Sequence, residues 1–460
     1  MSIMRLMKQY LGRIAYNKKS ASILAVCLVA AGIFIFSVFA SSPPLVKEVA
    51  VTELGAISNP SAPYLLRDGG VSGLLGGRVL WAFGDTIFFR KSVSGYNGYS
   101  NTAAYSMLST PTVVSEVLDP KGAPEAPLLP FTVEELNYNK NSGDPSKRYA
   151  LWPAAIIPES SDSALVLFDR LKVYPGTLNY EHISTGLARV RAGSTTAERV
   201  NDSLFVGMND QYLHSHVAQG GYHYFYNCTM RPASMNSDCS VARTTSVLNR
   251  SQYTFWNGST WTADMTKAAK TIPGSTSGFS VSYNPYLKSF VSATSTAFSK
   301  HIILRTAPNP EGPWSESIVA FSAPSSIYNV YQHPELARND GRDIVISYYR
   351  PEGEFKGKLQ LLSLRLNPRE AGEASSSTTP NQNPNATAPA SVATSVATIK
   401  PVTSSPQADY SYNSGAAGST EPVVPAQSEE TEQPPTPSRG FWAAVWFYLT
   451  APLRWLASLF

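Results

Sequence analysis

Five short runs of apolar and aromatic residues recur along the middle of this chain and limit its fold more than any other feature. Each run is rich in β-branched or aromatic side chains and is bounded by turn residues, which is typical of a β-strand. The runs begin about 55 to 85 residues apart, and a four-stranded propeller blade needs at least about 40 residues. They are RVLWAFGDT (78–86), ALVLFDR (164–170), GYHYFYNC (221–228), KSFVSATS (288–295) and RDIVISYY (342–349).

This spacing predicts an all-β domain over residues 50–368, and a five-bladed β-propeller is the architecture we expect. Only 15% of the residues are charged, whereas the chain holds 24 Tyr, 19 Phe and 8 Trp, a balance that favours many short strands. A single segment, TVEELNYNK (132–140), suggests a short helix. A two-sheet sandwich or two smaller β domains are the alternatives, but no internal linker divides the region.

The N-terminus predicts export. Residues 1–20 form a leader that carries five Lys or Arg residues and no acidic residue, and residues 21–40 are apolar and long enough to span a bilayer. The positive-inside rule keeps such a leader cytoplasmic and places everything after Ala40 outside. We expect a single-pass type II signal anchor with an extracellular or lumenal domain. A signal peptide cleaved after Ala40, which would give a secreted protein, is the alternative.

The C-terminal part of the chain has a different composition. Residues 370–438 are rich in Ser, Thr, Pro and Ala, so we expect a disordered linker that serves as a stalk. Residues 440–460 are apolar and aromatic but include Pro452 and Arg454, which disfavour a regular spanning helix. An interfacial, membrane-associating segment is expected. A glycolipid-anchor signal and a second span are the alternatives.

The charge of the chain argues against a nucleic-acid partner, and its cysteines and Asn-x-Ser/Thr sequences suit an exported domain. The formal charge of +4 is accounted for by the five basic residues of the leader, so no basic stripe suggests a nucleic-acid partner. Cys228 and Cys239 are expected to form a disulfide in an oxidising compartment, the alternative being two free thiols. Five Asn-x-Ser/Thr sequences are candidate glycosylation sites, at Asn201, Asn227, Asn249, Asn257 and Asn385.

Two aspartates in the segment LLRDGGVSGLLGGRVLWAFGDT are the candidate catalytic residues. Asp68 lies in Arg-Asp-Gly-Gly and Asp85 ends a strongly apolar run, with Gly-Gly turns between them. Two neighbouring antiparallel segments would bring both carboxyl groups to one end of a sheet, and glycoside hydrolysis usually needs such a pair. The structural alternative is that Asp68 starts a turn and Asp85 caps a strand.

The same segment resembles the first blade of the five-bladed β-propeller glycoside hydrolases. The likeness is greatest to the branch first described as a domain of unknown function and later linked to endo-D-arabinanase activity. Further stretches over about 60–366 agree, among them ALWPAAIIP (150–158), RTAPNPEGPWS (305–315) and YQHPELARNDGRDIVISYY (331–349). The resemblance implies that Asp68 and Asp85 match the two essential carboxylates of that group.

Other polar and aromatic residues are weaker candidates. Substrate binding is considered for Trp152, Asp169, Glu181, His333 and Glu335, and stacking on sugar rings for Trp152, Tyr283 and Trp314, although each also suits a structural role. His214 and His216 lie two positions apart, but no third ligand is evident, so we expect no metal site and no cofactor. The sequence lacks the repeated Ser-x-Asp-x-Gly-x-x-Trp box of sialidases, the GxSxG elbow and the HExxH helix.

The sequence therefore predicts a glycoside hydrolase that acts on an extracellular or cell-wall polysaccharide, possibly arabinan-like. A non-catalytic glycan-binding or adhesion propeller displayed at the cell surface is the alternative. A structural propeller that binds protein partners is a further one.

Overall fold

The computed structural model describes residues 44–369, apart from short gaps at 89–90, 143, 145, 176–178, 208–209, 232–235, 274–277, 297–298 and 354–355. No helix among these residues is long and apolar enough to cross a membrane. The leader (1–20), the expected anchor (21–40), the linker (370–438) and the aromatic tail (440–460) lie outside the described residues, so their predictions stand as made.

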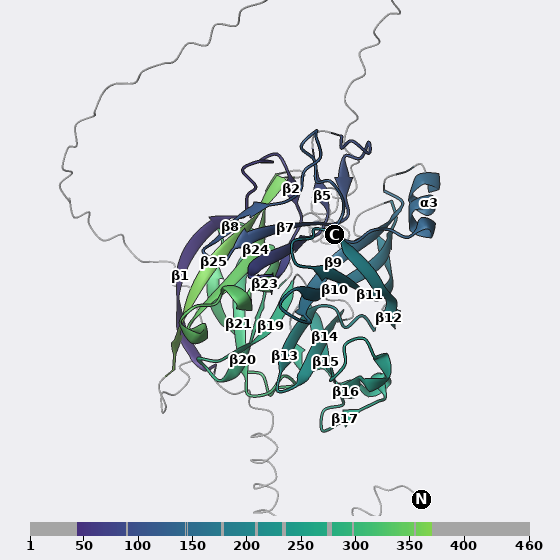
Figure 1. The fold of residues 1–460 in the computed structure, drawn as a ribbon. Helices are drawn as coiled ribbons and strands as arrows, with labels where there is room; N and C mark the ends of the chain where they lie inside the picture. The colour runs from purple at the N-terminus through teal and green to yellow at the C-terminus, as the bar shows by residue number, and fades with distance from the viewer. Residues whose placement is uncertain are drawn as a thin grey trace, which may run out of the picture. The chain divides into compact units, whose positions relative to one another are not determined.

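The described residues form six antiparallel sheets, and we number the five larger ones as blades in chain order (Figure 1). Blade 1 has β3 (Val71–Leu75), β4 (Arg78–Phe83), β7 (Thr102–Met107) and β8 (Thr110–Ser115). Blade 2 has β9 (Arg148–Pro158), β10 (Ser163–Val173), β11 (Tyr180–Arg191) and β12 (Ala197–Val206). Blade 3 has β13 (Ser215–Gln219), β14 (Tyr222–Met230), β15 (Ser237–Thr244), β16 (Thr254–Trp256), β17 (Trp261–Thr262) and β18 (Ile272–Pro273).

The remaining blades are built in the same way. Blade 4 has β19 (Phe279–Asn284), β20 (Ser289–Thr294), β21 (His301–Ala307) and β22 (Ile318–Ser322). Blade 5 has β23 (Tyr328–Gln332), β24 (Asp343–Gly353), β25 (Lys356–Pro368) and, from the other end of the domain, β1 (Val46–Ala56). Because β1 pairs with β25, the domain begins at Val46 rather than at the expected residue 50.

The five runs found in the sequence are the second strands of the five blades, namely β4, β10, β14, β20 and β24. A second strand has a neighbour on each edge and a blade on each face, so nearly all of its side chains are buried. In β4, Val79, Trp81 and Phe83 pack against blade 5, whereas Leu80 and Ala82 pack against blade 2. Successive side chains face opposite neighbouring blades, and both faces are buried. The run is therefore continuously apolar instead of alternating between apolar and polar residues.

The blades close into a ring. The buried hydrophobic residues form five clusters, and each cluster joins one pair of neighbouring blades: 1 with 2, 2 with 3, 3 with 4, 4 with 5, and 5 with 1. The first strands of successive blades also contact one another in the order β3, β9, β13, β19, β23. The all-β expectation is confirmed, and the sheets are arranged as blades are in a β-propeller.

Two local elements depart from this pattern. A small sheet of β2 (Leu66–Arg67), β5 (Thr86–Ile87) and β6 (Gly98–Tyr99) extends from blade 1. The expected short helix is present as α3 (Val133–Ser142), beside blade 2 in Figure 1. It starts with a capping box, because the Thr132 hydroxyl accepts from the Glu135 amide at 3.2 Å and the Glu135 carboxylate accepts from the Thr132 amide at 2.8 Å.

Glu135 also ties α3 to blade 2. Its side chain is fully buried and accepts hydrogen bonds from Arg170, whose Nε lies 2.5 Å from Oε1, and from Arg199. Burial raises the pKa of Glu135, but the two guanidinium groups outweigh it and hold the pKa below its usual value. This carboxylate therefore neutralises two cations inside the domain.

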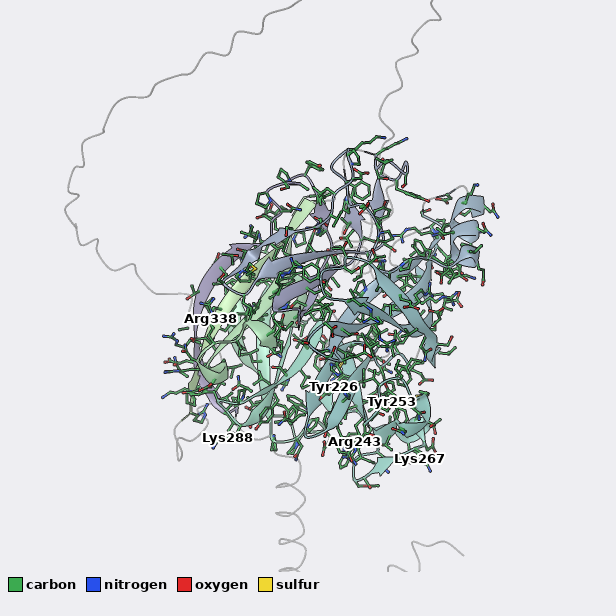
Figure 2. All side chains as sticks on the ribbon, in the orientation of Figure 1. Tyr226, Arg243, Tyr253, Lys267, Lys288 and Arg338 are labelled. Carbon is green, nitrogen blue, oxygen red and sulfur yellow. A yellow bond between two sulfur atoms is a disulfide. The ribbon has the colours of Figure 1, made fainter. Side chains whose placement is uncertain are left out.

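Blade 3 carries the disulfide. Cys228 and Cys239 are direct cross-strand partners in β14 and β15, and their sulfur atoms are bonded. Tyr226 and Arg243, labelled in Figure 2, belong to the same two strands. A hairpin that turns at Asn257-Gly258 joins β16 to β17, with Trp256 opposite Trp261.

One of the expected glycosylation sites is wrong for the folded chain. Asn227 is only 2% exposed, because it lies within β14 between two other strands. Asn201, Asn249 and Asn257 are more exposed, and each side-chain oxygen accepts from the backbone amide two residues further on, at 2.8, 3.2 and 3.0 Å. Asn385 lies outside the described residues.

Candidate functional site

Asp68 and Asp85 are brought together where the small sheet leaves blade 1. Arg67 and Thr86 are cross-strand partners, so the aspartates next to them are neighbours as well. The Asp68 amide donates to the Asp85 carbonyl at 2.8 Å, and the Gly84 amide donates to the Asp68 carbonyl at 2.9 Å. Two residues of one segment thus face a single residue of the other, which is a β-bulge.

Gly84 is required by this close approach. A Cβ atom at position 84 would lie 2.7 Å from the Asp68 carbonyl oxygen, and that oxygen belongs to the backbone. The glycine in Phe-Gly-Asp-Thr therefore permits the contact that sets the two aspartates side by side.

The Asp68 carboxyl group points toward blade 5. Its Oδ1 accepts a hydrogen bond from the Tyr328 hydroxyl at 2.9 Å and a longer one from Nδ2 of Asn329 at 3.4 Å. Burial raises the pKa of Asp68 to about 7; the Tyr328 hydrogen bond lowers it, and the nearby Asp85 charge raises it. This group therefore exchanges its proton near neutral pH, as an acid–base catalyst requires.

The Asp85 carboxylate points toward blade 2. Nη2 of Arg148 lies 3.2 and 3.1 Å from its two oxygens, and the Trp152 indole donates to Oδ1 at 3.4 Å. The Asp85 and Arg148 side chains keep 32% and 28% of their exposure, so the ion pair is accessible rather than buried.

An aspartate–histidine pair, Asp169 with His182, lies in blade 2. Asp169 is the cross-strand partner of Trp152, and Nδ1 of His182 lies 2.5 Å from its Oδ1. Burial raises the pKa of Asp169, and the histidine opposes that rise. Trp152 thus contacts Asp85, and Asp169 lies opposite Trp152 in the same sheet; substrate binding by these two residues stays a prediction.

His333 and Glu335 contact a residue of blade 1. Both contact the Ser72 hydroxyl, and Nδ1 of His333 lies 2.5 Å from it. His333 follows β23, and its contact with Ser72 in β3 is separate from the contact that Tyr328 makes with Asp68. Burial lowers the pKa of His333 to about 3 and raises the pKa of Glu335. Both residues join blade 5 to blade 1, and substrate binding by either of them stays a prediction.

Three further candidate residues, Glu181, Trp314 and Tyr283, have the following surroundings. Glu181 lies within β11 rather than in a loop, is exposed, and accepts from the Tyr174 hydroxyl at 3.0 Å. Trp314 is only 7% exposed and packs inside the core between blades 3 and 4, so it is not available for sugar stacking. Tyr283 packs in the same core, edge-on to Phe290.

The histidines considered for metal binding have protein partners. Nδ1 of His214 accepts from the Cys228 amide at 3.2 Å, and Nε2 of His216 lies 3.0 Å from Nδ1 of His223. Within the part of the chain that the structure describes, no group of three or more His, Cys, Asp or Glu side chains is arranged to hold a metal ion.

Sequence reasoning missed three residues of this site: Arg148, Tyr328 and Asn329. Arg148 begins β9 in a segment of mixed character, Lys-Arg-Tyr-Ala-Leu-Trp, where nothing distinguishes it from a surface cation. Tyr328 and Asn329 precede the expected HPEL segment, and their distance of about 260 residues from Asp68 hides the contact. Only ring closure makes them neighbours.

Residues 184–350 match the model of a family described as a domain of unknown function, DUF4185. This match covers parts of blades 2 to 5 and leaves out Asp68 and Asp85. No curated protein matches the chain.

Several solved structures are similar at low identity. A family 117 glycoside hydrolase from the marine bacterium Zobellia galactanivorans shares 9% identity over 70% of this chain and 92% of its own, with a TM-score of 0.47. A thermostable family-43 glycoside hydrolase shares 10% identity over 69% and 99%, with a TM-score of 0.42. The GH43_1 enzyme from Xanthomonas citri, complexed with xylotriose, shares 12% over 68% and 90%, with a TM-score of 0.41. No functional conclusion is based on likeness at this level.

Proposed function

We propose that this protein is a five-bladed β-propeller glycoside hydrolase whose reaction is carried by Asp68 and Asp85. The observation that supports this most is the contrast between the carboxyl groups of two aspartates on neighbouring backbone segments. Asp68 has a pKa raised to about 7 by burial, and Asp85 is paired with Arg148. Neighbouring carboxyl groups with different environments are what separates an acid from a base or nucleophile in such enzymes.

The roles follow from these environments. Asp68, protonated below about pH 7, donates its proton to the glycosidic oxygen that leaves. Asp85, paired with Arg148, acts at the anomeric carbon, either by direct attack or by taking a proton from the attacking water. After direct attack, ionised Asp68 takes a proton from a water molecule, whose oxygen displaces the Asp85 carboxylate from the anomeric carbon. After attack by water, the solvent returns a proton to Asp68 and takes one from Asp85. The Trp152 indole, which contacts Asp85, provides an apolar face against which a sugar ring packs.

The substrate class rests on the resemblance of the first blade. That resemblance implies an arabinan-like furanose polymer of a cell wall or extracellular matrix. The leader and the apolar segment 21–40 support an exported domain, with type II anchoring proposed ahead of cleavage after Ala40.

The experiment that tests this function is sugar release from a panel of arabinans, xylans and fructans by the full-length protein. We expect release from an arabinan, and a loss of about 10³-fold or more in Asp68→Asn and Asp85→Asn. Asp238→Asn is the matched control, because Asp238 also forms a two-contact pair with an arginine, Arg231, at 2.6 and 2.7 Å, but in blade 3. Activity that survives both active-site substitutions would contradict the assignment.

One observation favours the second candidate function, a glycan-binding module without turnover. Arg148 contacts both oxygens of Asp85, and in a binding protein this pair would serve only to hold sugar hydroxyls. The same panel separates the two functions, since a binding module would retain a polysaccharide in a pull-down and release no sugar from it.

A further inference from the structure

Two residues of the last blade reach across the closure of the ring to the candidate acid. Tyr328 and Asn329 begin β23, and both donate to the same oxygen, Oδ1 of Asp68, at 2.9 and 3.4 Å. Burial keeps the pKa of Tyr328 well above its usual value, and the negative charge of Asp68 adds to this rise. The tyrosine is therefore protonated throughout the neutral range and remains a hydrogen-bond donor.

The backbone is shaped to present these two side chains. The pairing of β23 with β24 shifts between Tyr328 and Tyr331, which is a β-bulge, and Asn329 within it has a φ of 53°. Such left-handed backbone is uncommon for a residue with a side chain, although asparagine tolerates it better than most. Bulges next to active sites commonly redirect a side chain.

Two glycines make room for this conformation. A Cβ atom on Gly69 would lie 2.6 Å from Nδ2 of Asn329, and one on Gly278 would lie 2.3 Å from the Val330 amide nitrogen. Gly69 follows Asp68 directly, and Gly278 precedes the first strand of blade 4. Blades 1 and 4 thus both accommodate the bulge of blade 5 that faces Asp68.

The arrangement has a chemical consequence for the proton of Asp68. An amide N–H group can only donate, so the Oδ1 that receives Asn329 and Tyr328 acts as an acceptor toward both. A carbonyl oxygen is a better acceptor than the oxygen of a carboxylic O–H group, so this arrangement favours the carboxyl proton on Oδ2. We propose that Tyr328 and Asn329 are positioning residues that hold the proton of Asp68 on Oδ2 and so fix the direction in which the acid delivers it. This inference rests on the proposed function for its catalytic meaning.

The test uses a direct titration together with kinetics. The Asp68 carboxyl is followed by ¹³C NMR in the full-length protein labelled at aspartate, and its resonance is identified by its loss in Asp68→Asn. Removing the Tyr328 hydroxyl in Tyr328→Phe removes a donor that favours the charged form. We expect the Asp68 midpoint to rise by about one pH unit. The alkaline limb of the kcat/KM profile should rise with it, and kcat should fall about tenfold with KM little changed.

The controls separate positioning from structure. Tyr331→Phe removes a different hydroxyl from the same strand. Burial and the charge of Asp68 raise the pKa of Tyr331 to about 12. This control should leave the titration midpoint of Asp68 unchanged. Asn329→Gly keeps the left-handed backbone, removes the second donor, and should raise the midpoint by a smaller amount. An unchanged or lowered midpoint in Tyr328→Phe, or an equal rise in Tyr331→Phe, would overturn the inference. If the midpoint shifts as expected but no polysaccharide is cut, the proposed function fails while the placement of the proton stands.

Discussion

The raised pKa of Asp68 predicts that the protein is more stable without this carboxylate. In the unfolded chain an aspartate titrates near 3.8, whereas in the folded protein burial moves the pKa of Asp68 to about 7. Between these values the folded state binds more protons than the unfolded state, so the free energy of unfolding falls as pH rises. Above about pH 7 the full cost of the buried charge is present, and below pH 3.8 none of it is.

The size of the effect follows from the shift. About three pKa units at 1.36 kcal/mol each set a ceiling of about 4 kcal/mol. The actual cost is below this ceiling, because Asp68 keeps partial exposure and water screens its charge. An asparagine oxygen can still accept from Tyr328, so Asp68→Asn should preserve that hydrogen bond. We expect Asp68→Asn to raise the free energy of unfolding by about 2–4 kcal/mol at pH 8 and by almost nothing at pH 4.

The assay is urea unfolding of the full-length protein and its variants at pH 4, 6 and 8, followed by tryptophan fluorescence. Asp238→Asn is the control, because Asp238 keeps a quarter of its side-chain exposure and pairs with an exposed arginine. Its free energy of unfolding is compared with that of the parent at the same three pH values. A difference between Asp68→Asn and the parent that is equal at pH 4 and pH 8, or a loss of stability at pH 8, would refute the reasoning.

Three further predictions concern the scaffold. Glu135→Gln removes the carboxylate that pairs with Arg170 and that shares Arg199 with Asp202, so it should cost about 3–5 kcal/mol, measured by urea unfolding. A cost under 1 kcal/mol would contradict this buried pairing. In Gly73→Val an added Cβ atom would lie 2.7 Å from Ile156, so the change should lower the melting temperature relative to the parent, and an unchanged melting temperature would contradict this tight packing. Replacing Cys228 and Cys239 together by serine should lower the free energy of unfolding by up to about 3 kcal/mol. Relative to the parent, the variant should have a lower urea midpoint under oxidising conditions and the same midpoint when the disulfide of the parent is reduced.

The fold could be predicted from the sequence because its signal is local and repeated. The second strand of each blade is buried on both faces, so it appears as an unbroken apolar run such as ALVLFDR. First and outer strands such as β1 carry exposed, mixed residues, and their membership in the ring was not visible. The start of the domain was therefore placed four residues late, since β1 is recognisable only through its pairing with β25.

The sequence could predict only those residues of the candidate site that have a suitable side chain and lie close together along the chain. Asp68 and Asp85 are close in sequence and separated by glycine turns, so their proximity could be inferred. Arg148 and Tyr328 come from the blades on either side of blade 1, and their contacts depend on how the blades are arranged. The contact of His333 with Ser72 depends on the same arrangement, since it joins blade 5 to blade 1.

The pairing of β1 with β25 also determines how the domain responds to mechanical force. Val46 is opposite Pro368, and the Arg369 amide donates to the Leu45 carbonyl at 2.7 Å, so both ends of the domain leave the same blade side by side. Tension applied between residues 44 and 369 would act across this antiparallel pair and load its hydrogen bonds one after another. The ring would then open by unzipping of a single strand at low force, while the other four blades remained folded.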